Sequence, residues 1–172
     1  MKQITLSLYS YDELSKEAKA RALRDWNENN NDDPFLTSHL YNLIKEELDE
    51  RGIKYAVDTI NVLYSLGYSQ GDGLMFEGEM TFEGHDVTVE HRGNYYHSYS
   101  KTVTWGDFEG ESKEGEEEAI AERFESVYHD ICKKIERAGY DEIEYQQSEE
   151  AFIGACEANE YTFEANGEMR NE

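Results

Sequence analysis

The sequence predicts an α+β fold, with an antiparallel sheet of about four to six strands and helices packed on one face of it. Three observations lead to this prediction. Apolar residues recur at helical spacing in three long segments, they alternate with polar residues between residues 53 and 105, and glycine-bearing turns separate the alternating runs. No repeat, linker or low-complexity segment divides the chain, so we expect residues 1–172 to form a single domain.

The chain is expected to begin with a strand and a helix. Residues 3–9 alternate apolar and polar side chains, as a half-buried strand does. Ser15 is a suitable N-cap for a helix whose apolar face ends near Glu28. The polar residues 29–32 predict a loop.

A second helix and the first long strand follow. Asp33 is the expected N-cap, and Pro34 suits the first helical position because its missing N–H needs no partner there. Gly52 is expected to end this helix in the left-handed conformation. Residues 53–66 are rich in β-branched and aromatic side chains and predict a strand.

Three further strands complete the predicted sheet. Leu74 to Phe82 form the next strand, and a turn at Glu83-Gly84 leads to a strand around Val87 and Val89. After a turn at 92–94, the alternating residues of 95–105 predict the last strand of this meander.

The C-terminal part returns to helical spacing. After a polar stretch at 106–115, one apolar stripe predicts a long helix that stops at Gly139. Ser148 is expected to cap a shorter helix, and the tail predicts a short strand followed by an Asn-Gly turn.

One stretch, LGYSQGDGLMFEG at residues 66–78, looks like a motif. A phosphate-binding P-loop needs Lys and Ser/Thr after its last glycine and a helix behind them, and this stretch has none of these. We expect a hairpin connection, in which Gly71 takes a positive φ and the polar side chains bind loop backbone. A recognition or active loop is the alternative. The residues of this motif loop are Ser69, Gln70, Gly71, Asp72 and Gly73.

Metal binding and catalysis have little support in the sequence. His85, His91 and His97 recur at six-residue intervals, without the closer pairs that zinc sites favour. Cys132 and Cys156 fit small core residues in a reducing compartment better than a disulfide framework. With no nucleophile motif either, we expect a non-enzymatic protein with no catalytic residue, no metal and no cofactor.

The charge balance is the strongest functional observation. The formal net charge is −23, and residues 109–172 carry 20 acidic and 6 basic residues, a net −14. Such a field disfavours direct contact with nucleic acid or anionic membrane and attracts basic proteins, although solubility alone also accounts for it. The acids predicted to form a partner-binding surface are Glu109, Glu111, Glu114, Glu116, Glu117, Glu118, Glu122, Asp141, Glu142, Glu144, Glu149 and Glu150.

Two segments resemble a group of small acidic proteins of bacteriophages and prophages. They are YSYDELSKEAKARA at Tyr9–Ala22 and YSQGDGLMFEG at Tyr68–Gly78. The resemblance implies a phage accessory protein that acts in the cytoplasm of the host bacterium, and it assigns no catalytic residues. Accessory proteins of this kind often block host defences, and acidic mimics of nucleic acid recur among them.

The expected function is therefore inhibition of a host nucleic-acid-binding defence protein, such as a CRISPR effector or a restriction enzyme. The acidic surface would occupy the groove that normally holds nucleic acid. Two alternatives remain: a small-molecule or nucleotide binder or enzyme with its site at the motif loop, and a structural or assembly protein of the phage particle. The N-terminal segment lacks the apolar core of a signal peptide, which agrees with a cytoplasmic location. The sequence leaves the oligomeric state open.

Overall fold

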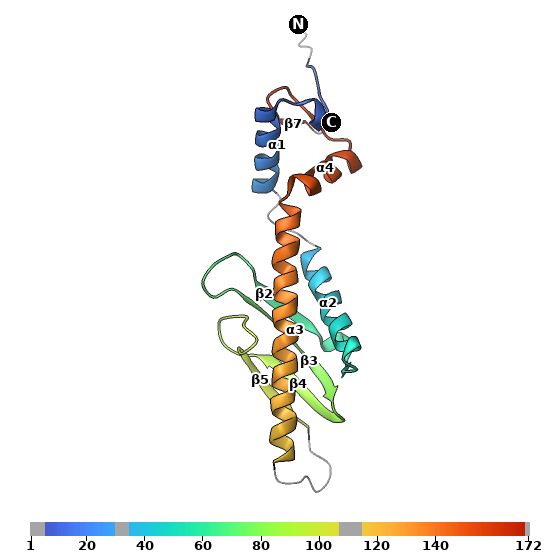
Figure 1. Ribbon diagram of the computed structural model, residues 1–172, viewed down its shortest axis with the longest axis vertical. Helices are drawn as coiled ribbons and strands as arrows, with labels where there is room; N and C mark the ends of the chain where they lie inside the picture. Colours follow the sequence, from blue (N-terminus) through green and yellow to red (C-terminus); the bar gives the residue numbers. More distant parts are fainter. Residues whose placement is uncertain (1–5, 30–34, 107–114, 171–172) are drawn as a thin grey trace. The chain divides into compact units, whose positions relative to one another are not determined.

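The structure, a computed structural model, describes residues 6–29, 35–106 and 115–170 (Figure 1). The chain groups into two compact units. We call Pro34–Asp141 the central unit, and Met1–Asp33 with Glu142–Glu172 the terminal unit. Their existence does not test whether residues 1–172 fold as a single domain, which stays a prediction.

The central unit contains an antiparallel sheet of five strands, as the sequence predicted. The strands are β1 (Lys54–Tyr55), β2 (Asn61–Ser65), β3 (Gly73–Phe82), β4 (His85–His91) and β5 (Lys101–Trp105). The order is β1-β3-β4-β5, and β2 also pairs with β3. The Glu83-Gly84 turn between β3 and β4 forms as expected, with both residues at positive φ.

The predicted strand at 53–66 is divided in two. β1 and β2 pair with successive parts of β3, and a 3₁₀ turn at Val57–Thr59 separates them. Opposite this break lies Gly78, at φ +153°, where an added Cβ would meet Ile60 Cδ1 at 2.5 Å. The side chain of Ile60 therefore occupies the space that a Cβ at position 78 would need.

Two helices cover one face of the sheet: α2 (Leu36–Glu50) and the portion of α3 (Glu116–Gln146) that belongs to the central unit (Figure 1). The buried face of α2 includes Leu40, Ile44 and Leu48, each fully shielded from solvent. α2 begins at Leu36, and the predicted cap at Asp33 and Pro34 lies outside the described residues. Gly52 follows the helix at φ +67°, as predicted.

α3 packs its aromatic side chains against the sheet. Phe124 contacts Phe82 and Trp105, with ring centroids 5.4 Å apart in both pairs. Tyr128 lies over Phe76 at 4.7 Å, and its hydroxyl binds both backbone groups of Phe76. The Phe76 N–H donates to this oxygen at 3.2 Å, and the hydroxyl donates to the Phe76 carbonyl at 2.6 Å. Tyr128 thus supplies hydrogen bonds for buried strand backbone.

The prediction that Gly139 stops the long helix is wrong, because α3 continues to Gln146. Gly139 is instead buried at a helix–helix contact. An added Cβ would lie 3.2 Å from Leu40 Cδ2 and 2.6 Å from Leu66 Cδ1. The absence of a side chain therefore allows close packing rather than helix termination.

One buried carboxylate joins the two helices of the central unit. Glu47 on α2 is 4 % exposed and forms ion pairs with Arg51 and Lys134. Burial by itself raises the pKa of Glu47, but the hydrogen bonds from Lys134 and Arg51 outweigh burial and lower it overall. Glu47 is therefore ionised and paired at neutral pH.

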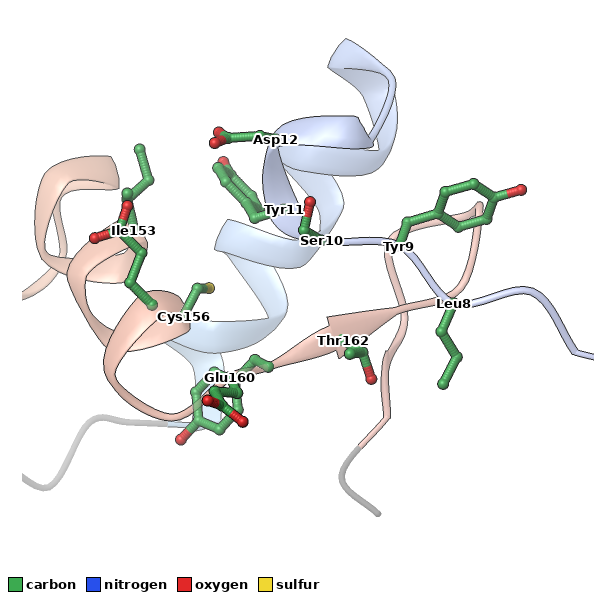
Figure 2. Close-up of a pocket in the computed structure, with 11 residues that line it drawn as sticks. Leu8, Tyr9, Ser10, Tyr11, Asp12, Ile153, Cys156, Glu160 and Thr162 are labelled. Carbon is green, nitrogen blue, oxygen red and sulfur yellow. The ribbon is translucent and has the colours of Figure 1, made fainter.

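The terminal unit has its own core. It contains a 3₁₀ turn (Tyr11–Glu13), α1 (Lys16–Asn29), α4 (Glu149–Ala158) and a hairpin of β6 (Thr162–Phe163) and β7 (Met169–Arg170). The Tyr11 ring packs against Phe152 at 5.1 Å and Phe163 at 6.0 Å, and Figure 2 shows Tyr11 beside Cys156 of the same core. Both predicted caps are present: the side chains of Ser15 and Ser148 accept N–H groups of α1 and α4.

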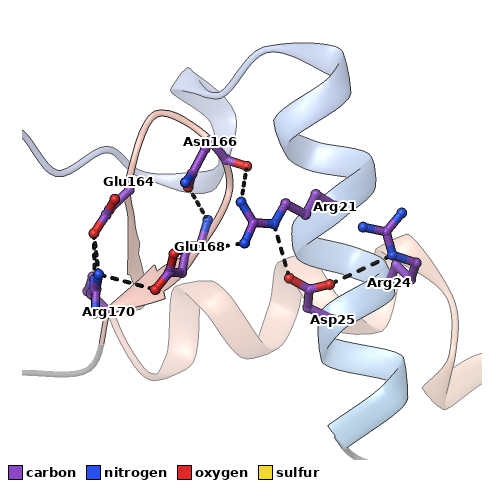
Figure 3. A network of polar contacts seen from close by, with 7 residues as sticks. All are labelled: Arg21, Arg24, Asp25, Glu164, Asn166, Glu168 and Arg170. Atoms are coloured by element: carbon purple, nitrogen blue, oxygen red, sulfur yellow. Dashed lines mark hydrogen bonds and ion pairs between the residues drawn. The ribbon is translucent and has the colours of Figure 1, made fainter.

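The hairpin rests closely on α1. Gly167 in its turn has φ +86°, and an added Cβ would lie 2.2 Å from the carbonyl oxygen of Ala18. Around this contact, Arg21 binds the carbonyl of Asn166 and forms an ion pair with Glu168 (Figure 3). Backbone approach and polar contacts together fix the hairpin on the helix.

Two predicted strands differ from the structure. Of residues 3–9, positions 6–9 are described, and only Tyr9 makes a β-bridge, to Phe163. Residues 95–100 belong to a loop and not to β5. The β4–β5 pairing ends at His91 and Lys101, and the Arg92 N–H donates to the Ser100 carbonyl just beyond that pair. Asn29, the first residue of the predicted loop at 29–32, is instead the last residue of α1, and residues 30–32 lie outside the described residues. Of the polar stretch at 106–115, residues 107–114 also lie outside them.

Candidate functional site

The motif loop is a hairpin connection, as predicted. It joins β2 to β3, with Ser65 opposite Gly73, and Gly71 has φ +103°. Tyr68 also takes a positive φ, of 56°, which the sequence did not indicate. Ser69 and Gln70 lie exposed within the loop. The positive φ of Tyr68 is uncommon for an aromatic residue and requires support from its surroundings.

Asp72 provides that support through four hydrogen bonds. Its carboxylate accepts the backbone N–H of Ser69 at 2.8 Å and the Ser69 hydroxyl at 2.9 Å. It also accepts the hydroxyls of Ser65 at 2.9 Å and Tyr140 at 3.0 Å. The backbone donor at Ser69, helped by the three hydroxyls, holds the pKa of Asp72 well below its usual range. Asp72 is therefore an ionised structural anchor.

A second loop, residues 92–100, packs against the motif loop. A Cβ added at Gly71 would meet Tyr95 Cε1 at 2.8 Å, and one added at Gly73 would meet His97 Nδ1 at 2.6 Å. Tyr95 also stacks on His97, with ring centroids 5.8 Å apart. Because Gly71 and Gly73 have no side chain, the rings of Tyr95 and His97 can pack directly against the backbone of the motif loop.

Each loop region carries an exposed tyrosine whose ring packs against a residue of α3. Tyr68 is 68 % exposed and lies 4.8 Å from the ring of Tyr140. Tyr99 is 72 % exposed and stacks on His129 at 4.9 Å. Tyr95 is 57 % exposed. Exposed tyrosines on supported loops are typical of contact surfaces, because the ring adds apolar area and the hydroxyl adds a polar tip.

The two α3 contacts fall on one flank of the helix. Residues three, four and seven positions apart share a face. By this rule the α3 flank includes Glu118, Glu122, Glu125, His129, Lys133, Glu136 and Tyr140. It extends over about 33 Å of helix axis. Carboxylates thus lie on the same helix face as the rings that support Tyr68 and Tyr99.

The first four turns of α3 are acidic beyond that flank. Their exposed carboxylates, which we call the acidic row, belong to Glu116, Glu117, Glu118, Glu122, Glu125 and Asp130. Only one base lies within this segment, Arg123, and it is paired with Glu83 at 2.5 Å. Lys101 pairs with Glu125 at 2.7 Å. The row therefore keeps a large excess of negative charge.

The remaining predicted acids fall into three groups. Glu109, Glu111 and Glu114 lie outside the described residues. Asp141 is about 28 Å along the helix axis from Glu122. The bases that separate the row from Asp141 along α3 are Lys133, Lys134 and Arg137. Glu142, Glu144, Glu149 and Glu150 belong to the terminal unit.

The structure also places the histidines and cysteines. His85 and His91 occupy the two ends of β4, and His97 lies in the loop at 92–100. Among the residues described, no three His, Cys, Asp or Glu side chains converge in a way that could hold a metal ion. Cys132 and Cys156 are buried free thiols, and burial is the main cause that raises their pKa to about 12 and about 11.

Comparisons with known proteins add no relative. The sequence matches no protein-family model, and no curated protein and no solved structure resembles it significantly. Within the described residues, no helix has both the length and the apolar composition needed to cross a membrane. The geometry of the loops and of α3 is thus the basis for any functional assignment.

Proposed function

We propose that this protein is a phage-encoded, non-enzymatic inhibitor of a host defence protein that binds nucleic acid, such as a CRISPR effector or a restriction enzyme. It acts in the host cytoplasm by placing its acidic row in the basic groove of the target. The observation that carries this proposal is the exposed row on α3, from Glu116 to Asp130. Its phage origin rests on the resemblance of the two sequence segments described above.

The spacing of the row suits a nucleic-acid mimic. Six carboxylates lie along about 21 Å of helix axis, so their mean separation along the axis is about 4 Å, and one of them, Glu125, is already paired with Lys101. One strand of B-DNA carries a charge every 3.4 Å or so along its axis. A groove lined with Lys and Arg at the spacing of phosphates would therefore meet carboxylates at a similar density.

Complementary charge mainly raises the association rate and orients the two proteins as they meet. A stable complex also needs side chains, often aromatic, that become buried against the partner and act as anchors. Tyr68, Tyr95 and Tyr99 offer such anchors because they expose large rings, and the rings of Tyr68 and Tyr99 contact the α3 flank. We propose that the row directs the first encounter and that these tyrosines pack against the target once the complex has formed.

The alternative of a ligand site at the motif loop is weakened by the role of Asp72. Both of its oxygens already accept hydrogen bonds from the chain itself, from Ser69, Ser65 and Tyr140. A ligand that bound this carboxylate would have to displace them. In the part of the central unit that the structure describes, no contact offsets this cost.

The first experiment is affinity capture from a host extract, followed by kinetics with the purified target at several salt concentrations. Glu118→Gln with Glu122→Gln removes two charges of the row and is expected to slow association about threefold to tenfold at low salt. Glu46→Gln with Glu50→Gln is the matched control, since these are also exposed helix glutamates four residues apart. The control is expected to change association much less.

Two results would contradict the proposal. Salt-insensitive association would exclude the electrostatic mechanism, because exposed charges are screened as salt rises. Failure of duplex DNA or guide RNA to compete with this protein for the target would exclude occupation of the nucleic-acid groove.

A further inference from the structure

The terminal unit contains a pocket that the proposed function does not use. It has a volume of about 350 Å³, within the range of pockets that hold small ligands. Segment 8–12, α4 and the start of β6 surround it. Its apolar lining includes Leu8, Tyr11, Ile153, Cys156 and Tyr161. Figure 2 shows Tyr11 and Cys156 facing this space from two different elements.

The charged lining of this pocket is entirely acidic. Asp12, Glu157 and Glu160 contribute carboxylates, and no Lys or Arg is among the lining residues. All three acids are exposed at the rim, with Asp12 next to Tyr11 and Glu160 near the start of β6 (Figure 2). The thiol of Cys156 experiences the same field: burial, with added contributions from Asp12 and Glu157, raises its pKa to about 11.

The chain itself places a cation at one side of the pocket. The Lys19 ammonium lies 5.2 Å from the centroid of the Tyr11 ring and 4.0 Å from the Asp12 carboxylate. An ammonium between an aromatic face and a carboxylate is a favourable arrangement. Elsewhere the lining contains a second aromatic ring, Tyr161, and two further carboxylates, Glu157 and Glu160, with no Lys or Arg among the lining residues.

We propose that this pocket binds an arginine side chain of a partner protein. The apolar wall would cover the methylene stem, and the rim carboxylates of Glu157 and Glu160 would bind the guanidinium. Arginine suits the site better than lysine, because its planar head is weakly hydrated and stacks on aromatic rings. The pocket lies in the terminal unit, so this inference is independent of the acidic row in the central unit.

The test is a titration of the isotope-labelled full chain with N-acetyl-arginine amide, followed by backbone amide NMR. We expect saturable shifts confined to residues 8–12 and 153–162. N-acetyl-citrulline amide has the same shape without the charge and is expected to produce little change. The variant Glu157→Gln with Glu160→Gln should weaken binding about threefold or more. Glu144→Gln with Glu150→Gln removes the same charge from exposed sites of the terminal unit that do not line the pocket, and should leave binding unchanged.

Each opposite outcome would overturn the inference. Equal shifts with the citrulline compound would show that charge is not recognised. Shifts outside the two segments, or shifts that do not saturate, would show that arginine binds elsewhere or without a site. An unchanged affinity after the double substitution at Glu157 and Glu160 would remove these carboxylates from recognition.

Discussion

The hydroxyl of Tyr128 offers the sharpest test of the core of the central unit. It is buried with Phe76 and serves both the N–H and the carbonyl of that residue. Tyr128→Phe keeps the ring and its contacts but leaves both backbone groups without this partner. Each buried polar group that loses its hydrogen bond costs about 1–3 kcal/mol, and a trapped water would recover part of this. We therefore expect the free energy of unfolding to fall by about 2–4 kcal/mol.

The measurement is urea unfolding followed by tryptophan fluorescence. Trp26→Phe in all variants leaves Trp105, which packs on Phe124 of the central unit, as the reporter. Tyr64→Phe is the matched control, because the Tyr64 hydroxyl makes one exposed hydrogen bond, to Thr37. It should cost about 0.5 kcal/mol or less. A loss for Tyr128→Phe below about 1 kcal/mol, or equal to the control, would refute the reasoning.

Three further changes test the packing and the pairing of charges. Gly167→Ala should destabilise the terminal unit by at least about 2 kcal/mol by thermal unfolding, whereas Gly84→Ala, with positive φ but open space around it, should cost about 1 kcal/mol. Gly139→Ala should destabilise the central unit despite its better helix propensity, whereas Gly154→Ala, which meets no atoms within 4 Å, should stabilise α4 by about 1 kcal/mol. Because the pKa of Glu47 is lowered in the folded chain, its stabilising effect is complete above the ordinary value of 4.5 and is lost as the pH falls through the lower, folded value. Glu47→Gln should therefore cost stability in neutral solution and flatten its loss in acid, and an unchanged acid profile would contradict the pairing.

Local chemistry explains what could be predicted from the sequence. Ser15 and Ser148 cap helices with hydrogen bonds to residues three positions later, so the signal lies within one turn. The Glu83-Gly84 turn and the positive φ of Gly71 likewise depend on adjacent residues. These features were predicted correctly because no distant part of the chain decides them.

The errors arose where distant contacts decide. Residues 95–100 continue the alternation of β5, but their rings pack on the motif loop and α3 instead of forming a ladder. Gly139 looks like a helix stop, and only its contacts with α2 and Leu66 show why a glycine is needed inside a helix. That error also hid part of the candidate surface. A helix ending at Gly139 cannot place Tyr140 on the same flank as Glu118 and Glu122.

The position of Asp72 connects the motif loop to the proposed function in a way that kinetics can separate from charge. Asp72 holds the Tyr140 hydroxyl, and Tyr140 in turn supports the exposed ring of Tyr68. Asp72→Asn should therefore loosen Tyr68 while leaving the acidic row intact. Anchors act mainly on dissociation and rim charges mainly on association. With the captured target we expect Asp72→Asn to raise the dissociation rate several-fold and to change the association rate little, the reverse of the substitutions at Glu118 and Glu122. If Asp72→Asn slowed association alone, the loop would act through its charge and Tyr68 would not be an anchor.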